Sequence, residues 1–331
     1  MSDSEQLYKD QTKVLKGQSP DSTKIHSRVS ELHYKHKLTH QQIAELLGTS
    51  RIKITRLLAE SLENGTVEIN IKDAPSLFLE TEKGLNQTFG LVQSWVVPAN
   101  LQPKIEQSSL SLAATDALNI SLTNETTVAV GSGKTIMEVS QNFKIKQNIN
   151  CTFLSPVGII PDHNLHFNAH STAEMFAQYS NNSSTSIPAP FAAHDARLMK
   201  MLMKDPSISK PLAQAAGADV LIASIGNISN QSFLVEAKLL STRELQAIKL
   251  SGAVGDVLGR FFDNLGTLVD SPFNQRIIGL TMEEIKNIPV RIGVASGKSK
   301  RNAILSALKG GIFNQLVTDN QTGLWLIDQH K

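Results

Sequence analysis

From about residue 91 onward, short apolar segments alternate with helical segments, and this alternation restricts the fold of the 331-residue chain more than any other feature. Parallel strands need a long crossover between them, usually a helix, and strands buried on both faces are continuously apolar. The pattern predicts an α/β domain with a Rossmann-like, mostly parallel sheet covered on both faces. The expected strands are SWVVP, TTVAVG, CTFLSPV, TSIPAP, ADVLIASIG, GDVLGRFF, VRIGVAS and NQLVTD. The expected helices lie near 106–120, 134–143, 171–180, 195–204, 207–217, 241–250, 299–309 and 320–328, and SNNSSTS at 180–186 is expected to be a surface loop.

Residues 39–58, THQQIAELLGTSRIKITRLL, have the pattern of two short helices joined by a tight turn. Thr39 can cap the first helix with Gln42 as its capping-box partner, and Gly48 permits a left-handed turn. Ser50 can cap the second helix, whose apolar residues repeat at helical spacing. Its other face carries Arg, Lys and Thr side chains, which suits a helix that enters the DNA major groove. The side chains expected at DNA are Thr39, Gln41, Ser50, Arg51, Lys53, Thr55 and Arg56.

The distribution of charge favours DNA binding over the alternative, a helical hairpin of a larger domain whose basic side chains are merely solvated. Between residues 24 and 60, seven Lys or Arg residues stand against three acidic ones, a local balance of +4. The whole chain has 32 basic and 30 acidic residues, a net charge of only +2. Positive charge is therefore concentrated in this segment, as expected of a DNA-binding module.

The same patterns divide the chain. The single cysteine, Cys151, excludes an internal disulfide, and no apolar run approaches the length of a membrane span, so we expect a cytoplasmic protein without membrane contact. A first helix is expected at 22–36, and the alternation at 67–71 predicts a short strand. The expected divisions are a flexible amino terminus at 1–21, a helix-turn-helix domain at 22–72, a linker or dimerisation segment at 73–90 and a ligand-binding domain at 91–331.

The segment VGSGKT, residues 130–135, follows an expected strand and opens an expected helix. Glycines let the backbone approach a phosphate, and the amino end of a helix favours an anion. A nucleotide P-loop is disfavoured because Val128 holds its first glycine position, and Ile136 holds the third glycine position of a dinucleotide motif. The segment is therefore either a simple phosphate cradle or an ordinary glycine-rich turn.

Two further segments carry groups suited to an anionic ligand. VASGKSKR at 294–301 places three cations at a helix start, which opposes the helix dipole unless an anion is present or the side chains reach solvent. In the segment 252–276, Asp256 could accept hydrogen bonds from sugar hydroxyls and Arg260 could pair with a phosphate, with turn formation or a structural salt bridge as the alternative. The residues expected at the ligand are Gly131, Ser132, Gly133, Lys134, Thr135, Asp256, Arg260, Lys298 and Lys300.

Metal binding and catalysis are disfavoured. His163, His166 and His170 have a spacing that could bring metal ligands together, but no cysteine accompanies them and the segment reads as a loop. The sequence offers no Ser-His-Asp or Cys-His order and no acid/base pair tied to a binding loop. We therefore expect no metal, no cofactor and no catalytic residues.

Nearly the whole chain, from about residue 25 to 328, resembles the SorC family of bacterial sugar-responsive transcriptional regulators. The resemblance rests on LTHQQIAELLGTSRIKITRLL, VGSGKT, IPAPF, GAVGDVLGRFFDNLG, and VASGKSKRNAILSALKGG followed by LVTD. It implies a helix-turn-helix followed by a domain similar to phosphosugar isomerases, which binds a phosphorylated sugar without converting it, in dimers or tetramers. It also implies that Gly131, Gly133 and Thr135 line the effector site, with Asp256 and Lys300 nearby.

The chain departs from the family pattern near the expected pocket. It has Ser296-Gly297 where members often have a Gly-Gly pair, and residues 155–158 where they have LxGG. Lys134 stands where the family commonly has a smaller or apolar residue, so it could add a phosphate contact. These departures prevent the family's effector from being carried over.

Together these features predict a regulator of a carbohydrate-utilisation operon that binds double-stranded operator DNA with an affinity controlled by a phosphorylated sugar. The alternative is an active enzyme like a sugar-phosphate isomerase with an attached DNA-binding domain. Such an enzyme needs a general base and a general acid in the pocket, for which Asp256 and the loop lysines are the candidates.

Overall fold

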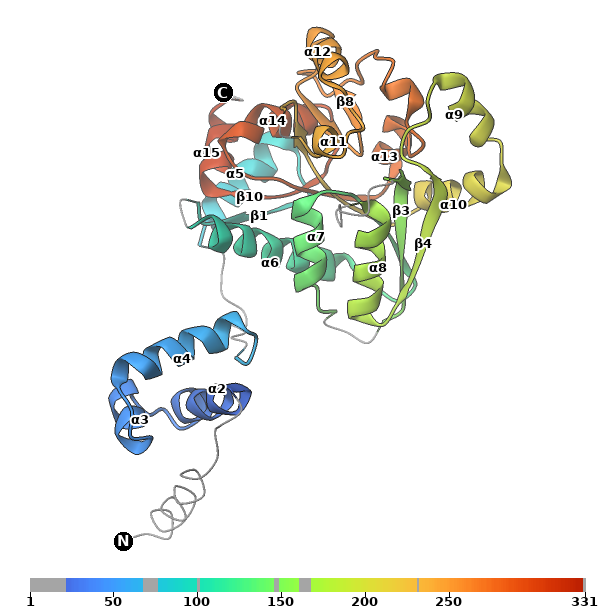
Figure 1. Ribbon diagram of the computed structural model, residues 1–331. Coiled ribbons are helices and arrows are strands. Elements are labelled where there is room, and N and C mark those ends of the chain that lie inside the picture. Colours follow the sequence, from blue (N-terminus) through green and yellow to red (C-terminus); the bar gives the residue numbers. More distant parts are fainter. Residues whose placement is uncertain are drawn as a thin grey trace. The chain divides into compact units, whose positions relative to one another are not determined.

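The computed structural model describes residues 22–67, 77–99, 102–145, 149–160, 168–230 and 232–329. It divides into two compact units, Met1–Ala74 and Pro75–Lys331, and each is described by itself (Figure 1). The expected amino-terminal segment at 1–21 and all but the first residue of the strand expected at 67–71 lie outside the described residues.

The first unit is helical, and the local rules of helix capping account for its boundaries. Thr39 and Gln42 form the predicted capping box, and Ser50 Oγ accepts a hydrogen bond from the Lys53 amide at 3.2 Å. Gly48 has a φ of 62°, the left-handed conformation that glycine adopts readily. The predicted turn and both caps are confirmed. The helices are α2 (Ser22–Ser30), which continues as the π-helical turn η1 (Glu31–Lys35), α3 (His40–Leu46) and α4 (Arg51–Glu63).

A small apolar core holds these helices together. The buried side chains of α4 are spaced three and four residues apart, so that one stripe of the helix faces inward. Ile54 is fully buried, and Leu57 and Leu58 are each 5% exposed. This stripe packs on α2, η1 and α3 through Val29, Leu32, Ile43 and Ala44.

The second unit contains the predicted parallel sheet. Seven strands follow the order β1-β10-β9-β5-β2-β3-β4, and each neighbouring pair is parallel. The strands are β1 (Gln93–Val97), β2 (Thr126–Val130), β3 (Cys151–Ile159), β4 (Ser183–Pro190), β5 (Val220–Ser224), β9 (Val290–Val294) and β10 (Gln315–Asp319). The helices are α5 (Leu79–Phe89), α6 (Pro103–Ser121), α7 (Lys134–Asn142), α8 (Ala169–Ser180), α9 (Ala196–Leu202), α10 (Pro206–Ala216), α11 (Phe233–Glu236), α12 (Thr242–Leu250), α13 (Met282–Asn287), α14 (Arg301–Lys309) and α15 (Asn320–Asp328), with short 3-10 turns at η2 (Asn274–Arg276) and η3 (Lys298–Lys300).

Apolar side chains cover both faces of this sheet, as its continuously apolar strands require. In β2, Val128 and Val130 belong to the core shared with α6, α7 and α8, which lie together in Figure 1. Ala129 points the other way, into the core shared with α5, α10, α13, α14 and α15. Alternate residues of one strand thus supply both layers.

The expected strand GDVLGRFF is not part of the parallel sheet. It forms a hairpin of β7 (Gly255–Val257) and β8 (Arg260–Phe262), which joins β6 (Gly226–Asn227) in a separate antiparallel sheet. Leu258 and Gly259 both have positive φ, 52° and 76°, which is the backbone of a two-residue hairpin turn. The prediction missed this reversal because leucine rarely adopts that conformation.

The surface loop expected at 180–186 is also shorter than predicted. Strand β4 already begins at Ser183 and pairs with Thr152 of β3, and the two hydroxyl oxygens lie 3.1 Å apart. β4 is an edge strand, so its first residues face solvent and can be polar. The loop assignment is therefore wrong for 183–186, of which 185 and 186 also belonged to the expected strand TSIPAP.

The sheet order locates a crevice. From β2 the chain moves outward through β3 to β4, and then crosses back to β5 on the other side of β2. The two halves of the sheet thus diverge between β2 and β5, and ligands of such sheets bind beyond the carboxyl ends of the strands at this point.

Candidate functional site

A cavity of about 320 Å³ lies beyond the carboxyl ends of β2 and β5. Its walls come from α6, from the loop after β2 and the start of α7, from the end of β5 and the segment after it with α11, from the β7–β8 hairpin, and from η3. The lining residues span positions 107 to 300, so only the fold brings them together. Of the residues expected at the ligand, the lining contains Ser132, Gly133, Lys134, Thr135, Asp256 and Lys300.

The loop after β2 has a backbone that only glycine takes easily. Gly133 has φ 107° and ψ 162°, and it is the N-cap of α7 without a side-chain cap. The carbonyl oxygen of Ser132 accepts a hydrogen bond from Ser224 Oγ at 3.1 Å, which joins this loop to the end of β5. The amides of the first turn of a helix have no partners within the helix, so an anion can take the place of a cap here.

Lys134, the first residue of α7, lines the same wall. Its Nζ lies 3.2 Å from Glu236 Oε2 of α11, so the ammonium group joins the start of α7 to the segment after β5. The Lys134 side chain is about half exposed, so solvent weakens this ion pair. The sequence did not indicate this contact between Lys134 and α11.

Asp256 and Lys300 bring opposite charges into the cavity. Asp256 Oδ2 accepts a hydrogen bond from the Gly259 amide at 3.2 Å, within the hairpin turn. Burial raises the pKa of Asp256 from 3.8 to about 6, and the Gly259 amide and the charge of Lys300 oppose that rise. Burial also lowers the pKa of Lys300, while the Asp256 charge raises it. Each charge therefore offsets part of the other's desolvation.

Gly226 permits this position of Asp256. A Cβ atom on Gly226 would lie 2.0 Å from Asp256 Oδ1 and 2.9 Å from its carboxyl carbon. β6 and β7 pair directly at these two residues, so any larger side chain at 226 would displace the carboxylate.

Gly131 and Arg260 were expected at the ligand, but they do not line the cavity. The Gly131 amide donates to the Ile222 carbonyl at 2.8 Å, so it belongs to the sheet and cannot donate to an anion. Arg260 is 7% exposed, and burial lowers its pKa to about 10. Its guanidinium donates to the carbonyls of Leu280, Asn274, Gly279 and Ile277 at 2.9, 2.7, 2.9 and 3.4 Å. Arg260 therefore has a structural role, which was the alternative expectation. Its partners are main-chain carbonyls rather than the carboxylate of a salt bridge.

The second glycine loop also differs from expectation. The Gly297 amide donates to Thr322 Oγ1 at 3.2 Å and, at 2.8 Å, to Oδ2 of Asp319, which is the N-cap residue of α15. This amide therefore already has partners within the protein. Lys298 is exposed and lies outside the lining, whereas Lys300 is turned into it. Of the three cations in this loop, only Lys300 reaches the cavity.

Several lining residues were not predicted, among them Gln107, Ser224, Asn227, Ser232 and Glu236. Ser224 is the last residue of β5 and Asn227 follows that strand, so the rule that ligands bind at carboxyl ends of parallel strands could have identified both. Asn227 Nδ2 donates to the Ser299 carbonyl at 3.2 Å, which links β6 to η3. Gln107 lies on α6, and no local pattern indicates that it reaches the cavity.

The first unit presents the side chains expected at DNA in two groups. Arg51, Lys53, Thr55 and Arg56 lie on the exposed face of α4. The hydroxyls of Thr39 and Ser50 act as helix caps, and Gln41 donates to Glu45 at 2.8 Å. The exposed cationic face of α4 is therefore the candidate DNA surface.

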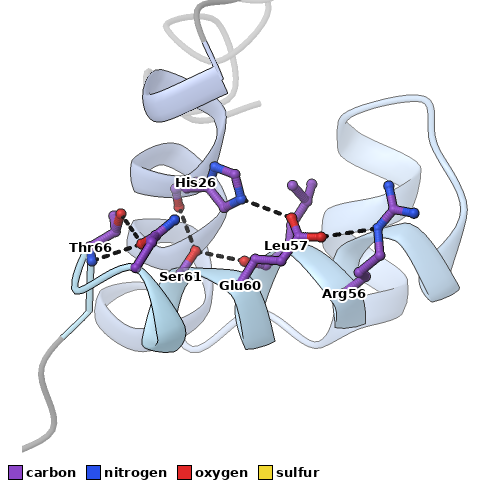
Figure 2. A network of polar contacts seen from close by, with 7 residues as sticks. His26, Arg56, Leu57, Glu60, Ser61 and Thr66 are labelled. Atoms are coloured by element: carbon purple, nitrogen blue, oxygen red, sulfur yellow. Dashed lines mark hydrogen bonds and ion pairs between the residues drawn. The ribbon is translucent and has the colours of Figure 1, made fainter.

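Polar contacts hold α4 against α2. Figure 2 shows Glu60 between His26 Nε2, at 3.0 Å, and Arg56 Nε, at 3.4 Å. Ser61 Oγ donates to the Leu57 carbonyl at 2.6 Å and lies 3.5 Å from the His26 carbonyl.

A polar contact also joins α4 to α3 through Thr55. Its hydroxyl donates to the Arg51 carbonyl at 3.1 Å, and Nδ1 of His40, the first residue of α3, lies 3.0 Å from the same hydroxyl. The Thr55 hydroxyl therefore has two partners within the first unit, the Arg51 carbonyl and the His40 ring.

Of the histidines considered as metal ligands, His163 and His166 lie outside the described residues, and His170 pairs with Glu174 at 3.3 Å within α8. Among the residues that the structure describes, no cluster of three or more His, Cys, Asp or Glu side chains could hold a metal ion. No helix in this part of the chain has both the length and the apolar character needed to cross a membrane.

Comparison with known proteins identifies the family. Residues 74–328 match the family described as "Putative sugar-binding domain". The chain is 32% identical over 303 residues to the transcriptional regulator LsrR of Escherichia coli strain K12, which covers 89% of this chain and 92% of that protein. The chain belongs to the SorC family of sugar-binding transcriptional regulators.

A further relative and a solved structure add to this comparison. The LsrR protein of Enterobacter sp. strain 638 is 33% identical over 306 residues, 89% of this chain and 90% of that protein. The full-length sorbitol operon regulator SorC from Klebsiella pneumoniae has a similar fold, with a TM-score of 0.73 and 23% identity over 93% of this chain and 100% of its own. The predicted order of a helical amino-terminal region and a mostly parallel α/β domain is confirmed by that likeness.

The two departures from the family pattern lie outside the cavity lining. Ser155 is buried in β3 and donates to the Val157 carbonyl at 2.7 Å. Gly158 lies so close to Pro190 that a Cβ atom would meet its carbonyl oxygen at 2.3 Å. Segment 155–158 therefore serves the contact between β3 and β4.

The raised pKa of Asp256 predicts a stability difference that depends on pH. Between the unfolded value and about 6 the folded protein binds more protons, so the free energy of unfolding falls as pH rises through this interval. Asp256→Asn removes the charge and should be more stable than the wild type at about pH 7.5 and nearly equal to it at about pH 4.5. Urea unfolding of both proteins at the two pH values measures this. A variant that gains no stability at the higher pH would contradict the raised pKa.

Proposed function

We propose that the protein binds double-stranded operator DNA through α4 and that a phosphorylated sugar in the cavity controls its affinity for that DNA. The observation that carries the proposal is the composition of the cavity wall. The wall offers the uncapped start of α7 with Lys134, the Lys300 ammonium and the Asp256 carboxylate. Such a wall suits a ligand with a phosphate at one end and hydroxyl groups at the other.

The size of the cavity supports a small ligand. About 320 Å³ is at the lower end of the range for small-molecule sites. In this proposal the phosphate lies against the amides of the loop 132–135 and near the ammonium of Lys300. Asp256 and Asn227 then face the sugar hydroxyls, which are the groups that a carboxylate and an amide bind.

The DNA-binding half of the proposal rests on the exposed face of α4. Its first turns carry Arg51, Lys53 and Arg56, while its opposite face is buried in the core of the first unit. Helix-turn-helix proteins bind as dimers whose recognition helices enter major grooves one turn apart, about 34 Å. We therefore propose a cytoplasmic dimer or tetramer that carries one reading helix per protomer and regulates a carbohydrate-utilisation operon.

Control by the ligand requires that it bind two arrangements of the protein unequally. A ligand that binds the DNA-competent and the incompetent arrangement with equal affinity shifts nothing, however tightly it binds. The cavity offers a means for such a difference, since its walls come from separate segments. Lys134 joins α7 to α11 and Asn227 joins β6 to η3, so a ligand there would contact several elements whose relative positions these bonds set.

One observation favours a second function, an active sugar-phosphate isomerase. Asp256 has a pKa of about 6, close to the value that suits a general base at neutral pH, and Lys300 faces it as a possible acid. Family membership favours the regulator, because the relatives with 32% and 33% identity are named transcriptional regulators.

The ligand proposal predicts different effects for two lysines of one loop. Lys300→Met should weaken binding of the sugar phosphate by about tenfold or more, because a buried hydrogen bond to a charged group is lost. Lys298→Met, two residues away and outside the cavity lining, should change the affinity by less than about twofold. A thermal-shift screen of the full chain with phosphorylated sugars identifies the ligand, and titration of the three proteins measures the ratio. Equal losses for both variants would contradict the placement of the phosphate.

The DNA proposal predicts a loss of affinity and of salt dependence together. The double variant Arg51→Ala/Arg56→Ala should bind the operator more weakly, with a slope of log affinity against log salt reduced by about one to two. Fluorescence anisotropy at several salt concentrations measures both. Lys309→Ala, which removes a cation at the end of α14 in the other unit, serves as the control. Unchanged affinity and slope in the double variant would remove α4 from the DNA interface.

The regulator and the isomerase predict opposite results when ligand and protein are incubated. A regulator returns the sugar phosphate unchanged, because binding without differential stabilisation of a transition state produces no turnover. Phosphorus NMR of sugar phosphates incubated with the full chain distinguishes the two. Product that appears with the wild type and disappears with Asp256→Asn would establish the isomerase instead.

A further inference from the structure

The recognition-type helix α4 exposes an isoleucine in its first turn. Ile52 is 82% exposed, whereas Ile54 on the same helix is fully buried. The apolar repeat of α4 accounts for Ile54, Leu57 and Leu58 but not for Ile52. Hydrophobic periodicity therefore left Ile52 without a role.

Helix geometry places Ile52 at the centre of the outward face. At about 100° per residue, Ile52 lies roughly 160° around the helix from Ile54, nearly opposite the core. Thr55 and Arg56 follow it by three and four residues, so they lie beside it one turn further along the helix. Arg51 and Lys53 adjoin it in sequence, and all four of these neighbours are exposed.

The surroundings of Ile52 distinguish between possible partners. A single exposed isoleucine is common on protein surfaces and needs no partner. Here, however, it is bordered by Arg51, Lys53 and Arg56, a cationic ring that fits a polyanion and disfavours the apolar centre of a protein interface. In the major groove, the group that an apolar side chain can contact is the C5-methyl of thymine.

We propose that Ile52 contacts the C5-methyl group of a thymine in the operator and so helps to determine the sequence that the protein prefers. This inference rests on the proposed function, the insertion of α4 into the major groove. Ile52 stands in the amino-terminal turn, the part of a recognition helix that reaches base edges.

The bonding of Thr55 strengthens the case for Ile52. The Thr55 hydroxyl lies 3.1 Å from the Arg51 carbonyl and 3.0 Å from His40 Nδ1, so it has two hydrogen-bond partners within the protein. Its hydrogen-bonding capacity toward a base is thereby reduced, although it adjoins Ile52 on the outward face. In this turn, discrimination between bases then depends on the arginines for guanine and on Ile52 for thymine.

Replacement of thymine by deoxyuridine tests the contact, because it removes the methyl group and nothing else. The full-length protein first selects a duplex from a random-sequence library, and each thymine of the selected half-site is then replaced in turn. We expect one position at which deoxyuridine weakens wild-type binding by roughly fourfold, the effect of one buried methyl group. Ile52→Ala should bind the thymine duplex about as weakly, and should show no further loss with deoxyuridine at that position.

Two further variants control the experiment. Leu62→Ala removes another exposed side chain of α4, 45% exposed near the far end of the helix, and should keep the full loss with deoxyuridine. Ile52→Val keeps a branched apolar side chain, so it should keep most of the loss of affinity with deoxyuridine. A repeated library selection with Ile52→Ala should lose the preference for thymine at the same position.

The outcomes separate the two proposals. If the wild type selects no sequence above non-specific binding, the proposed function fails, and the inference about Ile52 fails with it. If it selects a sequence but no thymine shows the loss, or Ile52→Ala keeps that loss, Ile52 does not contact a thymine methyl while α4 remains a DNA-binding helix. The contact is established if deoxyuridine weakens binding of the wild type and of Leu62→Ala at one position but does not weaken binding of Ile52→Ala there.

Discussion

The pairing of β2 with β5 is the constraint on which the cavity depends. The sheet diverges between these two strands, so the loops that follow them meet at one edge. Gly131 extends the pairing by one hydrogen bond, from its amide to the Ile222 carbonyl, and a Cβ at this position would lie 2.9 Å from Ala223 Cβ. Gly131, which the sequence suggested for phosphate contact, therefore belongs to the strand pairing instead. Without a side chain it lets β2 and β5 run close together up to the loop of Ser132 and Gly133.

A pair of opposite charges, each partly buried, then contributes to the chemistry of the cavity. Asp256 comes from a hairpin and Lys300 from the turn after β9, and each is unfavourable to bury alone. Their attraction, the amide of Gly259 and the missing side chain at Gly226 together accommodate the carboxylate. With a pKa of about 6, the charge of Asp256 is sensitive to other charges placed near it.

Much of the fold followed from the sequence because its determinants are local. Helix caps at Thr39 and Ser50 depend on a side chain and an amide three residues apart, and the alternation of apolar strands with helices reports burial on both faces. The errors occurred where local patterns have two solutions. An apolar run such as GDVLGRFF fits a buried strand or a hairpin, and only the positive φ of Leu258 and Gly259 decides. A polar run such as that at 183–186 fits a loop or an edge strand, and pairing with β3 decides.

By itself, the sequence determined that this chain has a capped helix-turn-helix and a glycine loop at the start of α7, since both are encoded within a few consecutive residues. Only the tertiary structure decided which charged groups serve the cavity. Lys298 and Lys300 are alike in sequence terms, but the Gly297 amide is bound by Asp319 and the turn that follows directs Lys300 inward. Arg260 was chemically suited to a phosphate, yet its donors are used by main-chain carbonyls. The physical reason is that a side chain's partner depends on its direction and on competing groups, and distant segments of the chain supply both.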